Sequence, residues 1–132
     1  MEISATINNS LHQNEVTVQT DGDAKIITIA SKAAGYGSSV NGAELLLLSL
    51  ATCFCNDIYR EAKKRKISVS EVKVECTGQF GKEGEPGSNF QYKAHVIADA
   101  TAEEIEDLIK YTDSVAEIHN TLRKGLPVTL TH

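Results

Sequence analysis

The sequence contains no tryptophan, and aromatic residues make up only 5% of its 132 residues. This scarcity argues against a protein that stacks nucleic-acid bases or sugar rings on aromatic side chains. Basic residues are not in excess either, since the formal net charge is -5 and leaves no positive footprint for a polyanion. We therefore expect a protein that does not bind nucleic acid.

Long apolar runs are also missing. No stretch approaches the roughly 20 apolar residues that a bilayer span requires. The N-terminal MEISATINN lacks a basic segment followed by an apolar one, which a secretory signal would have. The three cysteines are an odd number and do not form a secreted-type disulfide framework. We expect free thiols, a cytoplasmic location and no membrane association.

What is present is an ordinary globular composition, with 41% apolar and 23% charged residues. A chain of this length favours one hydrophobic core, and no repeat, linker or low-complexity block interrupts it. We expect a single domain over residues 1–132.

Hydrophobic patterning predicts three strands, a long helix, two strands, two helices and a last strand. The strands are expected at 1–8, 15–20, 25–31, 68–80, 90–100 and 127–132, and the helices at 44–66, 102–114 and 115–124. A glycine-rich loop at 35–42 precedes the long helix, and Gly125 ends the last one. The predicted fold class is α+β, with an antiparallel sheet wrapped around the long central helix.

The long helix has clear end signals. Asn41 is a candidate N-cap that closes a capping box with Glu44, and the basic run 63–66 complements the helix dipole at the other end. In its first half, residues 45–48 are all leucine and leave almost no polar face, so protein must surround them. A sheet covers only part of such a helix, and a second subunit is the usual cover. We therefore expect a homodimer.

Two cysteines, Cys53 and Cys55, lie inside this helix, and Cys76 points inward from the strand at 68–80. Residues two apart on a helix point roughly 200° away from each other, so Cys53 and Cys55 diverge and do not form a disulfide. No four-ligand zinc arrangement is present, and we expect neither a metal nor a cofactor. Spacing alone favours Cys53 as a small core residue over a reactive thiol.

The histidines are scattered along the chain and form no recognisable catalytic or metal-binding spacing. Each is expected to be structural or exposed rather than catalytic; they are His12, His95, His119 and His132.

At residues 41–54, NGAELLLLSLATCF, the sequence resembles the OsmC/Ohr family of osmotically inducible and organic hydroperoxide resistance proteins. That family has Asn-Pro-Glu-x-Leu, then small and apolar residues, then Ala-x-Cys-Phe, and this spacing places Cys53 on its first cysteine. Residues 115–130, VAEIHNTLRKGLPVTL, are similar to its second conserved segment. The resemblance covers nearly the whole chain.

The resemblance implies an intertwined homodimer with active sites at the subunit interface. It also implies a peroxidase cycle in which Cys53, as thiolate, attacks a hydroperoxide and becomes a sulfenic acid. In the family a second cysteine condenses with that sulfenic acid, an external dithiol reduces the disulfide, and an Arg paired with a Glu lowers the pKa of the first cysteine.

Matched residue by residue, the chain departs from this pattern. Ala116 stands at the position of the second cysteine, and Glu117 stands where Pro is usual. The family's Glu falls on Ala43, whereas Glu44 lies one residue later, a shift of about 100° on a helix. Glu44 is therefore a candidate for the capping box and, through the resemblance, for catalysis.

The activating arginine, which the family has in its N-terminal half, is absent from that region, because no Arg precedes Arg60. Lys25, Lys32 or Arg123 of the partner subunit could substitute, although a lysine cannot reproduce the bidentate guanidinium fork.

Two functions follow from these observations. The first is a thiol-dependent protein that reduces or senses organic or small hydroperoxides through Cys53 in oxidative-stress defence. An external thiol reductant, or Cys76, would then resolve the sulfenic acid. The alternative is a non-catalytic dimer that binds a small hydrophobic ligand in the interface cleft, with Cys53 as core packing.

Overall fold

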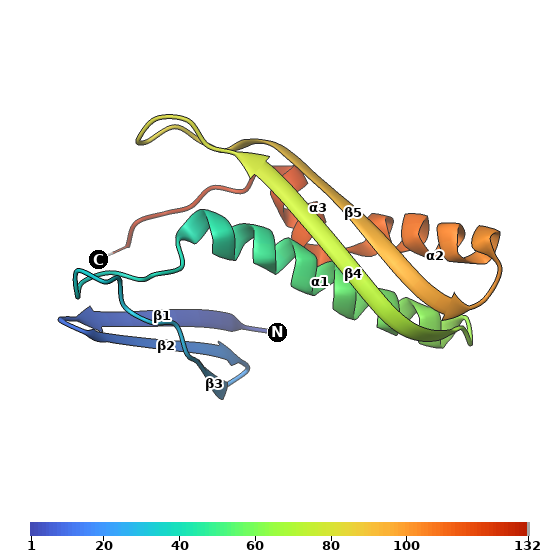
Figure 1. Ribbon diagram of the computed structural model, residues 1–132, viewed down its shortest axis with the longest axis horizontal. Helices are drawn as coiled ribbons and strands as arrows, with labels where there is room; N and C mark the ends of the chain where they lie inside the picture. Colours follow the sequence, from blue (N-terminus) through green and yellow to red (C-terminus); the bar gives the residue numbers. More distant parts are fainter. Residues whose placement is uncertain (132) are drawn as a thin grey trace. The chain divides into compact units, whose positions relative to one another are not determined.

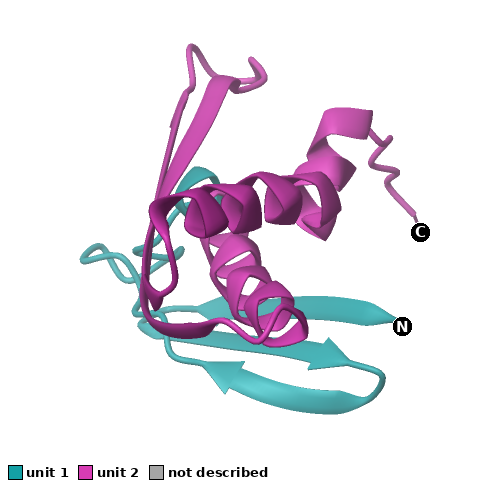
Figure 2. Ribbon diagram, turned by 90° about the vertical axis from the view of Figure 1, so that its right-hand side faces the viewer, with its two compact units in different colours: residues 1–45 teal, residues 46–132 magenta. Residues whose placement is uncertain are grey.

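The computed structural model describes residues 1–131 and contains two antiparallel sheets and three helices (Figure 1). His132, expected to be structural or exposed, lies outside the described residues. Two compact units can be distinguished, residues 1–45 and 46–132 (Figure 2). The strands are β1 (Ile3–Ser10), β2 (Gln13–Thr20), β3 (Asp23–Ile27), β4 (Ser68–Gln79) and β5 (Ser88–Asp99), and the helices are α1 (Gly42–Lys64), α2 (Ala102–Val115) and α3 (Glu117–Lys124). The predicted α+β class is confirmed.

The first unit is a three-strand antiparallel meander in the order β1-β2-β3, followed by a loop. The loop folds back onto the β1–β2 turn through Asn9, whose side chain donates to the carbonyl of Gly37 and accepts from its N–H, at 3.1 and 2.9 Å. Gly35 has a φ of 98°, and a Cβ there would meet Leu11 at 2.6 Å, so glycine is required at this position. The glycine-rich loop predicted at 35–42 is confirmed over residues 35–41, and Gly42 is the first residue of the following helix.

Helix α1 begins with the predicted capping box. The backbone N–H of Glu44 donates to Asn41 Oδ1 at 2.8 Å, and the backbone N–H of Asn41 donates to Glu44 Oε1 at 3.0 Å. The helix ends with Lys63 and Lys64 in its last turn, also as predicted.

In the second unit, one stripe of α1 is buried against the β4–β5 hairpin and the C-terminal helices (Figure 1). The inward side chains of β4 alternate as predicted, with Val72, Val74 and Cys76 on the covered face. The buried residues of the hydrophobic core cluster are Phe54, Ile58, Ala62, Val96, Leu108 and Ala116. The apolar start of α1 is not covered all round within one chain, because Leu48 remains 58% exposed.

The strand predicted at 127–132 is wrong over residues 127–131, which have no regular structure. A strand needs the backbone of a neighbouring strand, and within the described part of the chain none pairs with this segment. Val128 is completely exposed, and Leu130 is 87% exposed. Before this segment α3 ends at Gly125, which has a left-handed φ of 65° as the predicted helix stop requires. None of the helices over residues 1–131 is long and apolar enough to cross a membrane.

Candidate active site

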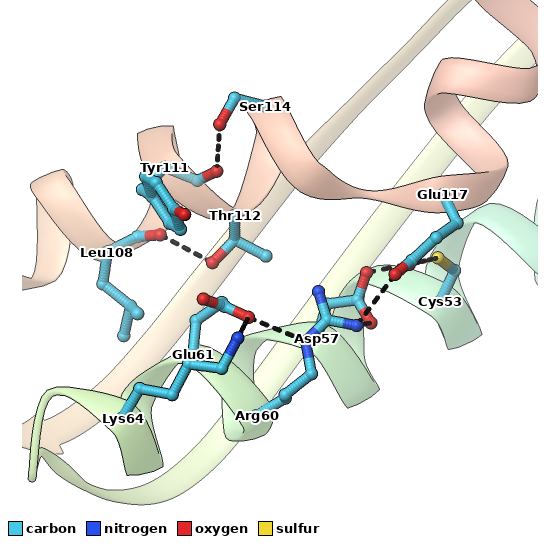
Figure 3. Close-up of polar contacts among 10 residues, drawn as sticks. All are labelled: Cys53, Asp57, Arg60, Glu61, Lys64, Leu108, Tyr111, Thr112, Ser114 and Glu117. Carbon is cyan, nitrogen blue, oxygen red and sulfur yellow. Dashed lines mark hydrogen bonds and ion pairs between the residues drawn. The ribbon is translucent and has the colours of Figure 1, made fainter.

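Helix α1 lines up four chemically active side chains on one face, one turn after another. Cys53, Asp57, Arg60 and Glu61 follow the helical spacing of three to four residues (Figure 3). The Cys53 thiol donates a hydrogen bond to Asp57 Oδ2 at 3.5 Å. Asp57 is only 6% exposed. The thiol is therefore paired, in its own helix, with a buried carboxylate.

The second contribution comes from the junction between α2 and α3. Ala116 has extended backbone angles and ends one helix and starts the next, and its side chain is completely buried. The chain turn at Ala116 brings Glu117 over α1, with its Oε2 at 3.9 Å from the Cys53 sulfur (Figure 3). The backbone N–H of Ile118, in the first turn of α3, also hydrogen-bonds the sulfur. The first-turn N–H groups of a helix have no partner within the helix, so they are free for such a bond.

Arg60 ties the carboxylates together. Its NH1 atom contacts Asp57 Oδ1 at 3.0 Å and Glu117 Oε1 at 3.0 Å, and its Nε contacts Glu61 Oε2 at 2.7 Å. Lys64 adds a second cation on Glu61 at 3.0 Å. Because the guanidinium is planar and presents several N–H donors, one arginine serves all three acids. It holds the carboxylates in place around the thiol, and it does not touch the sulfur itself.

These surroundings favour the neutral thiol at rest. Burial raises the pKa of Cys53 above its ordinary value, and the negative charges of Asp57 and Glu117 raise it further. The backbone N–H of Ile118 acts in the opposite direction but does not prevail. Burial, followed by the neighbouring Glu117 carboxylate, also raises the pKa of Asp57, which makes Asp57 a stronger base than an ordinary aspartate.

Glu117 behaves differently from Asp57. Backbone N–H donation at the start of α3 lowers its pKa, and the guanidinium of Arg60 stabilises its charged form as well. Of the two carboxylates, Asp57 is therefore the one that more readily takes up a proton. Glu117 stays ionised and anchors Arg60.

The sequence predicts other residues near the Cys53 thiol. Glu44 occupies the capping box, and a catalytic role for it stays a prediction. Arg123 donates instead to Asp113, at 2.7 Å, in the same chain. Cys55 lines a shallow depression with Val72 and Val74. The Cys53 thiol instead contacts Asp57 and Glu117. Cys53, Cys55 and Cys76 are all free thiols, as expected.

Sequence reasoning missed Asp57 and Glu117 as partners of the thiol, and Arg60 as the cation that holds them. Asp57 and Arg60 follow Cys53 at helical spacing, so the sequence places them on the same face of the helix. The same spacing is also typical of a solvent-exposed polar face. Glu117 carried no local signal, because its approach depends on the packing of α3 against α1.

Cys53, Asp57 and Glu117 also offer three donor atoms within 4.8 Å of one another. A metal ion there would lack the fourth protein ligand of a structural zinc site. The Arg60 guanidinium already bridges Asp57 and Glu117 and supplies the positive charge. The donor set therefore supports a thiol site with an internal cation rather than a metal centre.

Residues 35–131 match the model of a protein family described as OsmC-like protein. No curated protein sequence gives a significant match. Among solved structures, the OsmC-like protein from Mycoplasma pneumoniae is similar with a TM-score of 0.63 and 21% identity, covering 100% of both chains.

Two further structures match over most of their length. An OsmC-like protein of unknown function from Vibrio cholerae has a TM-score of 0.65 at 16% identity, covering 92% of this chain and 93% of its own. An organic hydroperoxide resistance protein from Elizabethkingia anophelis has a TM-score of 0.57 at 21% identity, covering 95% and 90%. At such identities these structures show a shared fold, and the resemblance seen in the sequence is confirmed.

Proposed function

The chain belongs to the OsmC-like protein family, and we propose that it is a thiol-dependent redox protein that reduces organic or small hydroperoxides through Cys53. One observation carries the proposal: the partly buried Cys53 thiol donates a hydrogen bond to the buried Asp57 carboxylate, beside Glu117 and Arg60. The name of the similar Elizabethkingia anophelis protein, organic hydroperoxide resistance protein, suggests the substrate class.

The first step is nucleophilic attack by sulfur on the terminal oxygen of the hydroperoxide. An S–O bond forms and the O–O bond breaks, so that sulfur is oxidised by two electrons to the sulfenic acid and the peroxide is reduced to an alcohol. The attacking species is the thiolate, and the raised pKa of Cys53 means that its proton must be removed as the reaction proceeds.

Asp57 is placed to remove that proton. Its Oδ2 atom accepts the thiol hydrogen bond, and its raised pKa makes it a better base than an ordinary aspartate. Protonated Asp57 then donates the same proton to the departing alkoxide, which leaves as a neutral alcohol. Arg60 holds Asp57 in position, and it offsets the negative charge that builds up when sulfur becomes anionic.

The sulfenic acid is resolved by a thiol from outside. Ala116 and Glu117 occupy the junction that faces the Cys53 sulfur, so the chain supplies no second cysteine there. An external thiol condenses with the sulfenic acid and releases water, and a second thiol of the same reductant displaces the mixed disulfide and restores Cys53. Cys76 is the intramolecular alternative.

The wider setting is proposed from the same resemblance. Residues 1–132 act as one OsmC-like domain, two chains form a homodimer, and the protein works in the cytoplasm in defence against oxidative stress. Glu44 is included as a second candidate catalytic residue, in addition to its part in the capping box.

A second function, a non-catalytic dimer that binds a small hydrophobic ligand, is favoured by the electrostatics of Cys53. Burial and two neighbouring acids raise the pKa of the thiol, whereas a reactive cysteine usually has a lowered one. In that case Cys53 only fills space beside the core.

Intact-protein mass spectrometry separates the two. The protein is exposed briefly to cumene hydroperoxide with a sulfenic-acid trap, beside Cys53→Ser and the matched control Cys55→Ser. Trapping in wild type and Cys55→Ser, and its loss in Cys53→Ser, support the proposed redox function. A Cys53–Cys76 disulfide would identify Cys76 as the resolving thiol. Equal, slow consumption of peroxide by wild type and Cys53→Ser in excess dithiol would refute the redox function.

A further inference from the structure

A second site lies in the same unit, one helical turn before Cys53 on α1. Its walls are Leu50 of α1, Phe90, Gln91 and Tyr92 of β5, and His119, Leu122 and Arg123 of α3. The pocket has a volume of about 160 Å³. A cavity of about 150 Å³ is sufficient for a benzene molecule, so a small organic ligand fits.

His119 is the unusual member of this lining. The residue is only 4% exposed, and neither Nδ1 nor Nε2 has a hydrogen-bond partner among residues 1–131. Its ring lies edge-on to Tyr92, with 4.5 Å between centroids, and is tilted against Phe54 at 5.7 Å. Buried polar groups are almost always paired, so a buried imidazole with two unpaired nitrogens that lines a pocket points to a ligand.

The imidazole is held in its neutral form. Burial lowers the pKa of His119, and the positive charge of Arg123 lowers it further, although Asp113 opposes both. A neutral imidazole presents one N–H donor and one acceptor nitrogen. A hydroxyl group can pair with either one, because it both donates and accepts.

Charged ligands are disfavoured because Arg123 is already engaged. Its guanidinium contacts Asp113 Oδ1 at 2.7 Å, the Asp113 carbonyl at 3.2 Å and Asn120 Oδ1 at 3.1 Å. The Tyr92 hydroxyl donates to the same Asp113 carboxylate. The arginine and the aspartate neutralise each other, so the pocket offers no free charge to an anion or a cation.

We propose that this pocket binds a small neutral molecule with an apolar, ring-sized body and one hydroxyl group, which hydrogen-bonds to His119. The apolar body packs against Leu50, Phe90 and Leu122, while the hydroxyl reaches the buried imidazole. The site is distinct from the thiol site, because Asp57 and Glu117, which accept hydrogen bonds from the Cys53 thiol, are not among its walls.

The test uses the full-length Cys53→Ser protein, so that its outcome does not depend on the proposed redox function. Phenol, benzene and benzoate are titrated separately, and the side-chain nitrogens of His119 are followed by long-range ¹H–¹⁵N NMR. The His119→Gln spectrum identifies the His119 signals, and His95→Gln, at an exposed position of β5, is the matched control.

We expect phenol to shift both His119 nitrogen signals and to bind roughly tenfold more tightly than benzene, since only phenol satisfies the buried imidazole. Benzoate should bind more weakly than phenol, and His95→Gln should leave phenol binding unchanged. Benzene or benzoate binding as tightly as phenol would overturn the proposal. So would an absence of phenol-induced shifts at His119, a result that needs no variant other than Cys53→Ser to be folded.

Discussion

The Cys53 thiol donates to the Asp57 carboxylate one helical turn further along α1, at 3.5 Å, and Asp57 is almost completely buried. In this pair, one carboxylate has two opposing effects on the thiol. The carboxylate raises the pKa of the thiol and so reduces the thiolate population, yet it is also the base that can take the proton away. Substitution of Asp57 therefore separates acidity from reactivity.

Asp57→Asn should lower the pKa of Cys53, because it removes a neighbouring negative charge and keeps the side-chain shape. The hydroperoxide reaction should nevertheless slow roughly 100-fold, since the amide cannot accept and return the proton. The thiol pKa is measured by pH-dependent alkylation and the rate by peroxide consumption in excess dithiol. A lower pKa with a faster peroxide reaction would show that Asp57 only suppresses the thiolate.

Arg60→Gln should destabilise the fold by about 1–2 kcal/mol, because the buried acids Asp57 and Glu61 lose their shared guanidinium. The expected loss of stability is smaller than for a fully buried ion pair, because Arg60 is 38% exposed and Lys64 still contacts Glu61. Urea unfolding measures the change.

Lys73→Gln is the control for Arg60→Gln, since Lys73 pairs with Glu75 on the exposed face of β4. It should stay within about 0.5 kcal/mol of wild type. Equal effects of the two substitutions would show that the Arg60 network has no more than surface-pair strength.

Most of the fold could be predicted from the sequence because its signals are local. The capping box at Asn41 and Glu44, the alternation along β4 and the left-handed stop at Gly125 each depend on a few neighbouring residues. The strand at 127–132 could not be judged in this way, since a strand exists only where another backbone pairs with it.

The candidate site was predicted only in part, because local signals identify single residues but not the contacts between distant parts of the chain. Cys53 was found through the resemblance. The approach of Glu117 depends on how α3 packs on α1, and no spacing along the chain encodes that contact. Arg60 was passed over because the family pattern places its arginine in the N-terminal half, whereas here the cation follows the cysteine on the same helix.

Alkaline pH should weaken the fold through the half-buried thiols of Cys53 and Cys76. Burial raises the pKa of Cys53 and of Cys76. Groups with a raised pKa in the folded state contribute stability that is complete below their unfolded pKa, about 8.5 for a thiol, and that is lost as the pH rises through the folded value. Stability should therefore decline above about pH 8.5.

Cys53→Ser and Cys76→Ser should each flatten that decline, whereas Asn56→Ser, at an exposed and non-titrating position of α1, should not. Urea midpoints measured in steps from pH 7.5 to about pH 10.5 give the comparison. Parallel curves for wild type and both cysteine variants would show that the thiols are not the groups responsible.

Glu44→Gln tests the two roles of Glu44 against each other. Glutamine preserves the capping box, so stability should stay within about 0.5 kcal/mol, whereas Asn41→Ala should cost about 1 kcal/mol by removing the cap. If Glu44 is catalytic, Glu44→Gln slows the Cys53 peroxide reaction and Asn41→Ala does not. A rate unchanged by Glu44→Gln would leave Glu44 with its capping role alone.

Self-association is expected from apolar side chains that one chain leaves uncovered. Leu48 on α1 is 58% exposed, and Val128 and Leu130 in the C-terminal segment are 100% and 87% exposed. Analytical ultracentrifugation should show a dimer, and Leu48→Glu should shift it toward monomer, because a carboxylate in an apolar interface loses its hydration without gaining a partner.

His95→Glu introduces the same charge at an exposed position of β5 and should leave the dimer intact. A monomeric wild type would contradict the expectation directly. A dimer that resists Leu48→Glu would show that the apolar start of α1 lies outside the interface, and Val128→Glu would then test whether the C-terminal segment forms it. Because a carboxylate at exposed Leu48 has little effect within one chain, any loss of dimer reports on the contact between chains.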